Sequence, residues 1–296
     1  MLRSIPIVLA VFFSAGELPA GSADSYASQI QSWRKDYDRD LVSADGPFTL
    51  VARLSPPKGS SSLGRDKTND LILPVETAPA HAGKIDWPGG DTATFHVESG
   101  VTALVDGKAV NEIAIAKPVT VAFGELKLIF AMRDSALRVA IEDANSRMRK
   151  EAKPPVWFPV EPRYRIVADW IPVSEPKTIR IPDNNGSSRE WKNPGSASFV
   201  VDGVKVNLMA VLTPDGKKLS FFFRDRTAGH ETYGAGRFLE ADLPQNGKVV
   251  VDFNKAYNPY CAVNELFICP VPPRENHLPV GIRAGERNHP HAEMSH

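Results

Sequence analysis

The C-terminal third of the chain contains the densest group of side chains that could do chemistry. Nine polar or aromatic residues lie beside short apolar stretches: Tyr233, Arg237, Asp252, Asn254, Tyr257, Asn258, Glu275, Asn276 and Glu286. Polar side chains at strand ends can converge on a pocket, in which Arg237 would hold an anionic group. A pair such as Asp252 and Glu275 could then do acid–base work. The alternative is structural, because Asn and Asp beside proline commonly cap turns and satisfy backbone groups.

The first 23 residues are typical of a signal peptide. A basic residue at position 3 precedes an apolar run over residues 5–15, and small residues occupy positions 21 and 23. The run is shorter than the roughly 20 residues of a membrane-spanning helix, and no later stretch could span a bilayer. We therefore expect cleavage after Ala23 and export to the periplasm or the medium. A buried N-terminal helix is the alternative.

Export gives the two cysteines, Cys261 and Cys269, a specific meaning. In an oxidising compartment two such cysteines are expected to form one disulfide that closes a small loop. Together with His277 they could instead hold a metal ion, but a zinc finger needs paired chelates at closer spacing. We therefore predict a disulfide and no metal site.

Composition and motifs argue against several other classes of protein. The 35 basic and 35 acidic side chains give a formal net charge of zero, whereas a nucleic-acid-binding protein normally has a basic excess. The sequence contains no G-x-S-x-G nucleophile motif. The glycines at 234 and 236 do not open a predicted helix, as a nucleotide-binding loop would. We therefore predict no cofactor.

One helix and a long series of strands must position these residues. Between residues 24 and 44, five residues at helical spacing share one face: Tyr26, Ile30, Trp33, Tyr37 and Leu41. We expect this face to pack against the domain that follows, which is a commoner role for such a stripe than a platform for a ligand.

From residue 45 the apolar period changes to two, which is typical of strands. Residues 45–143 are interpreted as a meander of short strands that forms a small β-sandwich, with a hairpin turn at Asp106-Gly107. Residues 144–156 are polar and end in two prolines, which indicates a linker. Residues 157–287 are interpreted as a second β-rich domain and residues 288–296 as a disordered tail. The predicted fold class is mainly β, with one short N-terminal helix.

Part of the sandwich resembles the forkhead-associated domain, which binds phosphothreonine peptides through its loops. The resemblance rests on Gly64-Arg65, Asn69-Asp70, His81 and the Asp106-Gly107 turn. It implies a β-sandwich fold. However, Ala78 stands where that family has its phosphate-binding serine, so phosphate would meet Arg65 without the other donors that it needs. We therefore expect no phosphopeptide binding, and a structural role for His81.

The C-terminal part resembles a bacterial family called domain of unknown function sixteen eighty-four. The resemblance rests on four blocks: TYGAGRFL at 232–239, DFNKAYNPYC at 252–261, CPVPPREN at 269–276 and AGE at 284–286. It extends back through Trp157-Phe158-Pro159 to the sandwich. The resemblance implies no established activity.

These observations favour a binding or structural-interaction protein of the cell envelope, with a polar ligand pocket in the C-terminal domain. Its partner would be a small polar ligand or another protein. The alternative is a hydrolase that uses Asp252 and Glu275, with Arg237 holding an anionic substrate group. The two hypotheses differ in a geometric requirement, because the enzyme needs Arg237, Asp252, Asn258 and Glu275 around one cavity that solvent reaches.

Overall fold

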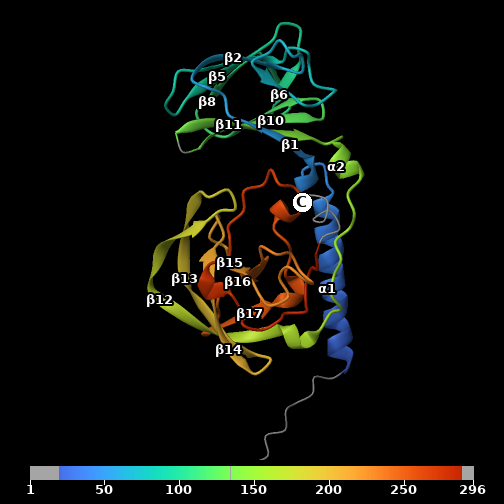
Figure 1. Cartoon of the computed structure of the whole chain (residues 1–296), viewed down its shortest axis with the longest axis vertical. Coiled ribbons are helices and arrows are strands. Elements are labelled where there is room, and N and C mark those ends of the chain that lie inside the picture. Colours follow the sequence, from blue (N-terminus) through green and yellow to red (C-terminus); the bar gives the residue numbers. More distant parts are fainter. Residues whose placement is uncertain (1–19, 134, 289–296) are drawn as a thin grey trace, which may run out of the picture.

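The computed structural model describes residues 20–133 and 135–288. They form a helix α1 (Ala20–Leu41), a β-sandwich, a connecting segment and a second β-domain, as Figure 1 shows. Most of the predicted signal peptide and nearly all of the predicted tail lie outside the described residues. The helix begins inside the predicted signal peptide and so four residues before position 24.

Two sheets face each other in the N-terminal domain and enclose one hydrophobic core. The first sheet has the order β1-β11-β10-β9-β6-β7, and the second has the order β3-β2-β4-β5-β8. The strands are β1 (Leu50–Leu54), β2 (Gly59–Gly64), β3 (Leu71–Ile72), β4 (Gly83–Trp87), β5 (Ala93–Val97), β6 (Ala103–Val105), β7 (Lys108–Val110), β8 (Glu112–Ile115), β9 (Val119–Phe123), β10 (Leu126–Arg133) and β11 (Ala136–Asp143). The predicted sandwich is confirmed. Its predicted hairpin turn joins β6 to β7, with positive φ at Asp106 (49°) and Gly107 (75°).

The residues that resemble the forkhead-associated family hold the sandwich loops together. The Asn69 side chain donates to the carbonyl of Ala80 at 2.9 Å, and its oxygen lies 3.2 Å from Nδ1 of His81. A Cβ on Gly64 would stand 2.2 Å from the same Ala80 carbonyl, so only glycine fits this approach. These contacts are structural, as predicted for His81.

The C-terminal domain is one antiparallel sheet of order β16-β15-β14-β13-β12-β17. Its strands are β12 (Arg165–Pro182), β13 (Ser188–Val201), β14 (Val204–Leu212), β15 (Lys218–Phe223), β16 (Arg237–Asp242) and β17 (Lys248–Asp252). The two edge strands, β16 and β17, lie at opposite ends of this order but close together in space. The sheet is therefore curled until its edges face each other, and we call the line between β16 and β17 the seam.

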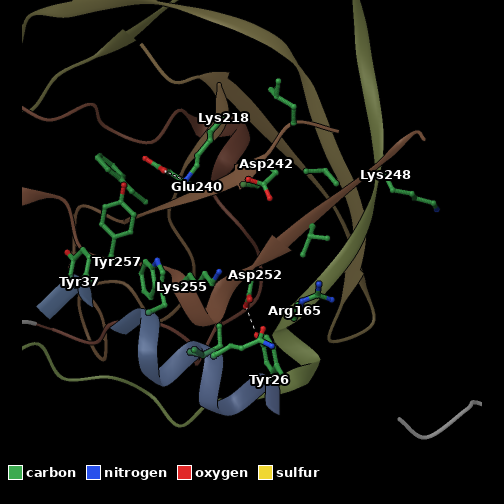
Figure 2. A pocket seen from close by; sticks show the side chains of 18 of the residues that line it. Tyr26, Tyr37, Arg165, Lys218, Glu240, Asp242, Lys248, Asp252, Lys255 and Tyr257 are labelled. Atoms are coloured by element: carbon green, nitrogen blue, oxygen red, sulfur yellow. Dashed lines mark hydrogen bonds and ion pairs between the residues drawn. The ribbon is translucent and has the colours of Figure 1, made fainter. Parts of the chain in front are cut away.

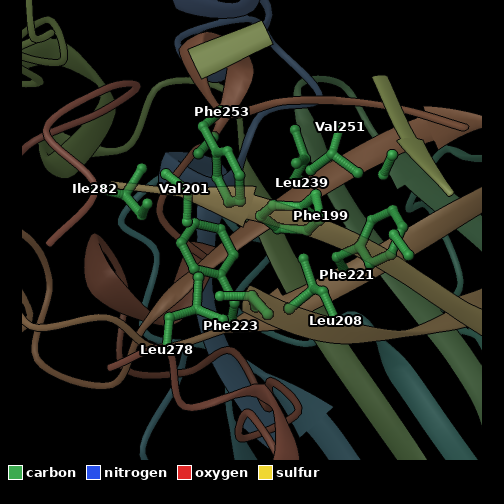
Figure 3. Close-up of a cluster of buried hydrophobic side chains, with 14 of the residues drawn as sticks. Phe199, Val201, Leu208, Phe221, Phe223, Leu239, Val251, Phe253, Leu278 and Ile282 are labelled. Carbon is green, nitrogen blue, oxygen red and sulfur yellow. The ribbon is translucent and has the colours of Figure 1, made fainter. Parts of the chain in front are cut away.

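The inner face of this sheet carries the core of the C-terminal domain. Alternate residues of each strand point inward, and four phenylalanines dominate the cluster in Figure 3: Phe199, Phe221, Phe223 and Phe253. The rings of Phe223 and Phe253 lie 5.2 Å apart at an interplanar angle of 78°, an edge-to-face arrangement that aromatic pairs prefer. The residues on the opposite, outward face of β16 and β17 are free to build a site.

The linker and one loop connect the two domains. Residues 144–156 include a single helical turn, α2 (Arg147–Lys150), which Ser146 caps by accepting from the Arg149 amide. The loop after β17 returns to the sandwich, where the Asn264 side chain donates to the carbonyls of Pro47 (2.9 Å) and Leu50 (2.8 Å). The sandwich is thus attached to the C-terminal domain by buried hydrogen bonds as well as by the linker.

Helix α1 packs against the C-terminal domain, so the expectation that it packs on the following domain is wrong. Figure 1 shows it lying along that domain, with the sandwich beyond its C-terminal end. The buried Arg34 guanidinium donates to the carbonyls of Phe158 (2.8 Å) and Asn254 (3.1 Å). Periodicity identified the buried face of the helix, but which domain covers it depends on partners more than a hundred residues away.

Candidate functional site

Arg237, predicted to hold an anionic group, is enclosed in the protein. Its side chain is 1% exposed and donates to the Asp225 carboxylate at 2.7 Å, to the Ile282 carbonyl at 2.8 Å, and to the carbonyls of Ala284 and Glu286. Nε has no hydrogen-bond partner in the described structure, but the whole side chain is enclosed, so no face of the guanidinium is open to a ligand. The prediction that Arg237 binds a ligand has no geometric basis here, and its role is to tie residues 282–286 to β16.

Glu286 belongs to the same enclosed network and does not reach solvent. Its carboxylate accepts from the Asn258 backbone amide at 2.8 Å, and the Asn258 side chain donates to the Arg287 carbonyl at 2.7 Å. Burial raises the pKa of Glu286 to about 8, because a charged carboxylate loses its hydration there. Asn258 and Glu286 therefore hold residues 284–287 in place, and neither of them lines an open pocket.

Two asparagines act as cross-links between chain segments. The Asn276 side chain bonds to both backbone groups of Met209 and to the Phe222 carbonyl, at 2.8 to 2.9 Å. The Asn254 side chain bonds in the same manner to both backbone groups of Glu161, at 2.9 and 2.8 Å. The amide groups of both side chains are occupied by backbone partners, in agreement with the structural alternative that the sequence left open.

The acid–base pair of the hydrolase hypothesis is not brought together. Glu275 is an exposed residue of a short 3₁₀ helix, whereas Asp252 lies at the end of β17 and lines a cleft that Glu275 does not border. Tyr233 is also outside this cleft, beside Cys261. Of the nine residues, Asp252 and Tyr257 alone line the cleft.

This cleft has a volume of about 820 Å³ and lies between α1 and the outward faces of β16 and β17, as Figure 2 shows. Its lining combines aromatic, aliphatic and charged side chains: Tyr26, Gln29, Ile30, Trp33, Tyr37, Arg165, Lys218, Phe238, Glu240, Ala241, Asp242, Leu243, Gln245, Lys248, Val249, Val250, Asp252, Lys255, Tyr257, Pro259, Tyr260 and Cys269. We call it the seam cleft. Its size is that of a small-molecule or peptide site.

A hydrogen bond fixes α1 as one wall of the seam cleft. The Tyr26 hydroxyl donates to Asp252 at 2.7 Å, and the Asn254 side chain donates to the same hydroxyl at 3.0 Å. Burial, and then the neighbouring Asp252 carboxylate, raise the pKa of Tyr26, which stays protonated as a donor. Together with the Arg34 contacts, this bond holds the helix against the strands.

Aromatic rings line the wall next to this bond. Trp33 and Tyr37 stack with their centroids 5.6 Å apart, and Tyr37 lies 5.5 Å from Tyr257. The Lys255 ammonium stands 6.0 Å above the Trp33 ring, at the outer limit of a cation–π contact. Four members of the predicted helical stripe thus line the cleft, and the ligand-platform alternative for that stripe gains a geometric basis.

Some charged groups around the seam cleft are paired and others are not. Lys218 pairs with Glu240 at 3.5 Å. Lys248 pairs at 2.5 Å with Asp169, a residue that does not line the cleft. Within the described residues, Lys255 and Asp242 form no ion pair. In this part of the chain the cleft therefore offers a cation and an anion that have no protein partner of opposite charge.

Sequence reasoning missed Lys218, Glu240 and Asp242, because they are ordinary charged residues on the solvent face of amphipathic strands. The one feature that could have identified them is their place on the strands, where they alternate with apolar residues and so face outward. Nothing in the sequence indicates that β16 is an edge strand or that α1 crosses in front of it.

The predicted disulfide is wrong. Cys261 and Cys269 are free thiols and do not stand at disulfide distance. They are in contact, since a hydrogen bond between them, together with burial, raises the pKa of the Cys261 thiol. Other bonds already hold the loop: Asn184 exchanges hydrogen bonds with the Cys269 backbone at 3.0 and 3.1 Å, and Asn264 anchors the loop's middle.

The described residues contain no group of three His, Cys, Asp or Glu side chains that could hold a metal ion. His277 lies near the Pro272 carbonyl, and the histidines of the tail lie outside the described part of the chain. None of the described helices combines the length and hydropathy needed to cross a bilayer.

Comparisons with solved structures found similar chains. An uncharacterized protein of Haloarcula marismortui is 29% identical, over 50% of this chain and 81% of that one, with a TM-score of 0.41. The FHA-2 domain of a Mycobacterium tuberculosis ABC transporter is 26% identical, over 30% and 80%, with a TM-score of 0.23. An FHA domain of Chlamydia trachomatis is 15% identical, over 34% and 90%, with a TM-score of 0.24. A comparison with curated proteins found no match.

The family match covers the C-terminal part of the molecule, which contains the whole curled sheet, the enclosed Arg237 network and most of the seam cleft. Residues 155–287 match the model described as "Protein of unknown function (DUF1684)".

Proposed function

We propose that the protein is a binding protein and that the seam cleft holds its ligand. The observation that carries the proposal is a cleft of about 820 Å³ beside the rings of Trp33 and Tyr37, in which Lys255 and Asp242 have no partner of opposite charge among the described residues. A binding site combines an apolar wall with a few polar groups that fix orientation. The expected ligand has an apolar or planar body and carries groups of both charges.

The geometry favours binding over catalysis. Asp252 is occupied by the Tyr26 hydroxyl and the Asn254 backbone amide, and Glu275, its partner in the enzyme hypothesis, does not border the cleft. Arg237, which the enzyme hypothesis assigned to the substrate, is enclosed. We therefore assign no catalytic residue.

Saturation-transfer difference NMR with a library of fragment-sized compounds tests the proposal on the full chain. We expect saturable hits that are lost in Trp33→Ala and weakened about fivefold or more in Lys255→Met, since each removes one feature of the wall. Lys108→Met, an exposed lysine of β7 in the sandwich, is the matched control and should leave the hits unchanged. An absence of hits, or hits that both cleft variants retain, would overturn the proposal.

We also propose that the protein is exported, on the basis of the basic start and apolar run in residues 1–23. The intact mass of the protein from its natural host tests this directly. The expected mass is that of a chain that begins at Asp24. A mass that corresponds to a chain beginning at Met1 would contradict export through a cleaved signal peptide.

A further inference from the structure

Two chain segments run side by side at the C-terminal end of β15. Residues 224–226 follow that strand directly, and residues 276–283 belong to the last part of the domain. The Arg224 N–H donates to the Asn276 carbonyl at 3.1 Å, and the Arg224 carbonyl accepts from the Leu278 N–H at 2.7 Å. These two bonds make a parallel bridge, so the segments form a short two-stranded ribbon with an inner and an outer face.

The two faces of this ribbon differ in composition. The inward residues are buried: Asp225, Leu278, Val280 and Ile282. The outward residues alternate with them and are exposed: Arg224, Arg226, His277, Pro279 and Arg283. A short 3₁₀ helix (Arg274–Asn276) precedes His277, and because such a helix has three residues per turn, Arg274 stands on the same side as His277. We call this outward set the arginine face: Arg224, Arg226, Arg274 and Arg283.

Most of the positive charge of the arginine face has no counterpart in the protein. Arg283 pairs with Glu231 at 2.9 Å, whereas the other three arginines form no ion pair within the described residues. The Arg224 side chain is held in place, since its Nε donates to the Gly234 carbonyl at 3.0 Å. Glu275 is the one other carboxylate of these segments that is exposed. The whole chain has a formal net charge of zero, so this excess of cations is local.

We propose that the arginine face attaches the protein to a membrane surface by binding the phosphates of anionic phospholipid headgroups. A guanidinium forms two parallel hydrogen bonds with a phosphate, which a lysine ammonium does not. All four basic side chains of these segments that carry a permanent charge are arginines. The inference goes beyond the proposed binding function and does not depend on it, because none of the four arginines lines the seam cleft.

The form of the arginine face favours a membrane surface over a soluble polyanion. Pro279 and Gly281 lie between the arginines along the ribbon and carry no long side chain, so the guanidinium groups can approach a broad surface together. A single anionic polymer is commonly held in a basic groove, whereas these arginines stand on an exposed ribbon. A membrane presents phosphates in two dimensions, and each basic side chain near an anionic leaflet strengthens attachment about fivefold.

Vesicle flotation tests this inference on the chain as its natural host produces it. The vesicles contain either phosphatidylcholine alone or equal parts of phosphatidylcholine and phosphatidylglycerol. The test variant is Arg226→Gln/Arg274→Gln, because neither side chain forms a hydrogen bond or ion pair in the described structure and the fold should be kept. The matched control is Arg147→Gln/Arg180→Gln, which removes the same charge from side chains that are 88% and 75% exposed elsewhere on the surface.

We expect the wild type to float with the phosphatidylglycerol vesicles far more than with phosphatidylcholine alone, and to be released at about 0.5 M salt, which screens the attraction. The test variant should bind at least about tenfold more weakly, and the control should bind as the wild type does. Equal binding to both kinds of vesicle, or an equal loss in both variants, would overturn the inference. Binding to soluble polyphosphate without binding to vesicles would also overturn it, and would identify an anionic polymer as the partner.

Discussion

The C-terminal domain contains two clusters of polar residues, and they differ in their access to solvent. Around Arg237, the guanidinium is bonded to Asp225 and to three carbonyls, and both ions of the pair are about 1–2% exposed. Around the seam cleft, Lys255 and Asp242 border the cavity and form no ion pair in the described part of the chain. The first cluster lies inside the protein, whereas the second borders an open cleft.

This difference distinguishes residues that stabilise the domain from residues of the proposed binding site. A buried charge must be satisfied inside the protein, since leaving it unpaired costs several kcal/mol. A half-exposed charge needs no partner in the protein, because water solvates it and the cost in free energy is small. Arg237 and Glu286 are therefore assigned to stability, while the proposed binding site lies on the outward face of β16 and β17.

The largest effect is expected from Arg237→Met. The substitution leaves the Asp225 carboxylate buried without its cation, which should cost about 3–5 kcal/mol in the free energy of unfolding. Urea denaturation measures it. Asp225→Asn added to this variant should recover part of the loss, and a variant as stable as the wild type would show that the network does not close the domain.

A pH-dependent effect is expected from Glu286→Gln. The folded pKa of Glu286, about 8, lies above its ordinary value of 4.5, so the folded state favours the protonated form. This contribution is complete below pH 4.5 and is lost as the pH rises to about 8, by at most about 1.4 kcal/mol per pH unit. Urea denaturation across this range should show a flatter profile for the variant, which exceeds the wild type in stability at the alkaline end.

The Asn258 side-chain oxygen in the same cluster is buried and has no hydrogen-bond donor in the described structure. Parallel pH profiles for the wild type and Glu286→Gln would contradict the raised pKa of Glu286.

A smaller loss of stability is expected from Tyr26→Phe, which removes a hydrogen bond at the edge of the seam cleft. The variant keeps the ring but removes the hydroxyl that donates to Asp252, so we expect a loss of about 1 kcal/mol in the free energy of unfolding. Thermal denaturation followed by circular dichroism measures it. Since the hydroxyl holds α1 as a cleft wall, fragment binding should weaken at a temperature where the protein is folded. Unchanged binding would mean that the other contacts of α1, such as those of Arg34 and Asp38, are sufficient to hold it.

The smallest effect on stability is expected from Lys255→Met. Because Lys255 forms no ion pair among the described residues, its replacement should change the free energy of unfolding by less than about 0.5 kcal/mol. Its effect on ligand binding should be clear at the same time. A loss of more than about 2 kcal/mol would show that the cleft residues are structural too, and the contrast between the clusters would disappear.

Local features of this chain were predictable from sequence because they depend on neighbouring residues. The turn at Asp202-Gly203 joins β13 to β14 with φ of 46° and 77°, which Asp and Gly tolerate and most residues do not. The same holds for the period-two strands of the sandwich. The long strand β12 follows the alternating pattern only at its start, at Ile166 and Ala168. Pro172 and the polar residues after it do not follow the pattern, and a register shift between Pro172 and Lys177 accommodates them.

The sequence by itself determined the mainly β class, the two-domain division and the residue types from which a site could be made. Only the tertiary structure decided which of those residues are enclosed and which face a ligand. Arg237 and Asp242 stand five residues apart on one strand, yet one is buried and the other is exposed at the seam. Alternation along a strand gives two faces, but what covers each face depends on segments such as α1 and residues 282–286, which are distant in sequence and arrive only when the chain folds.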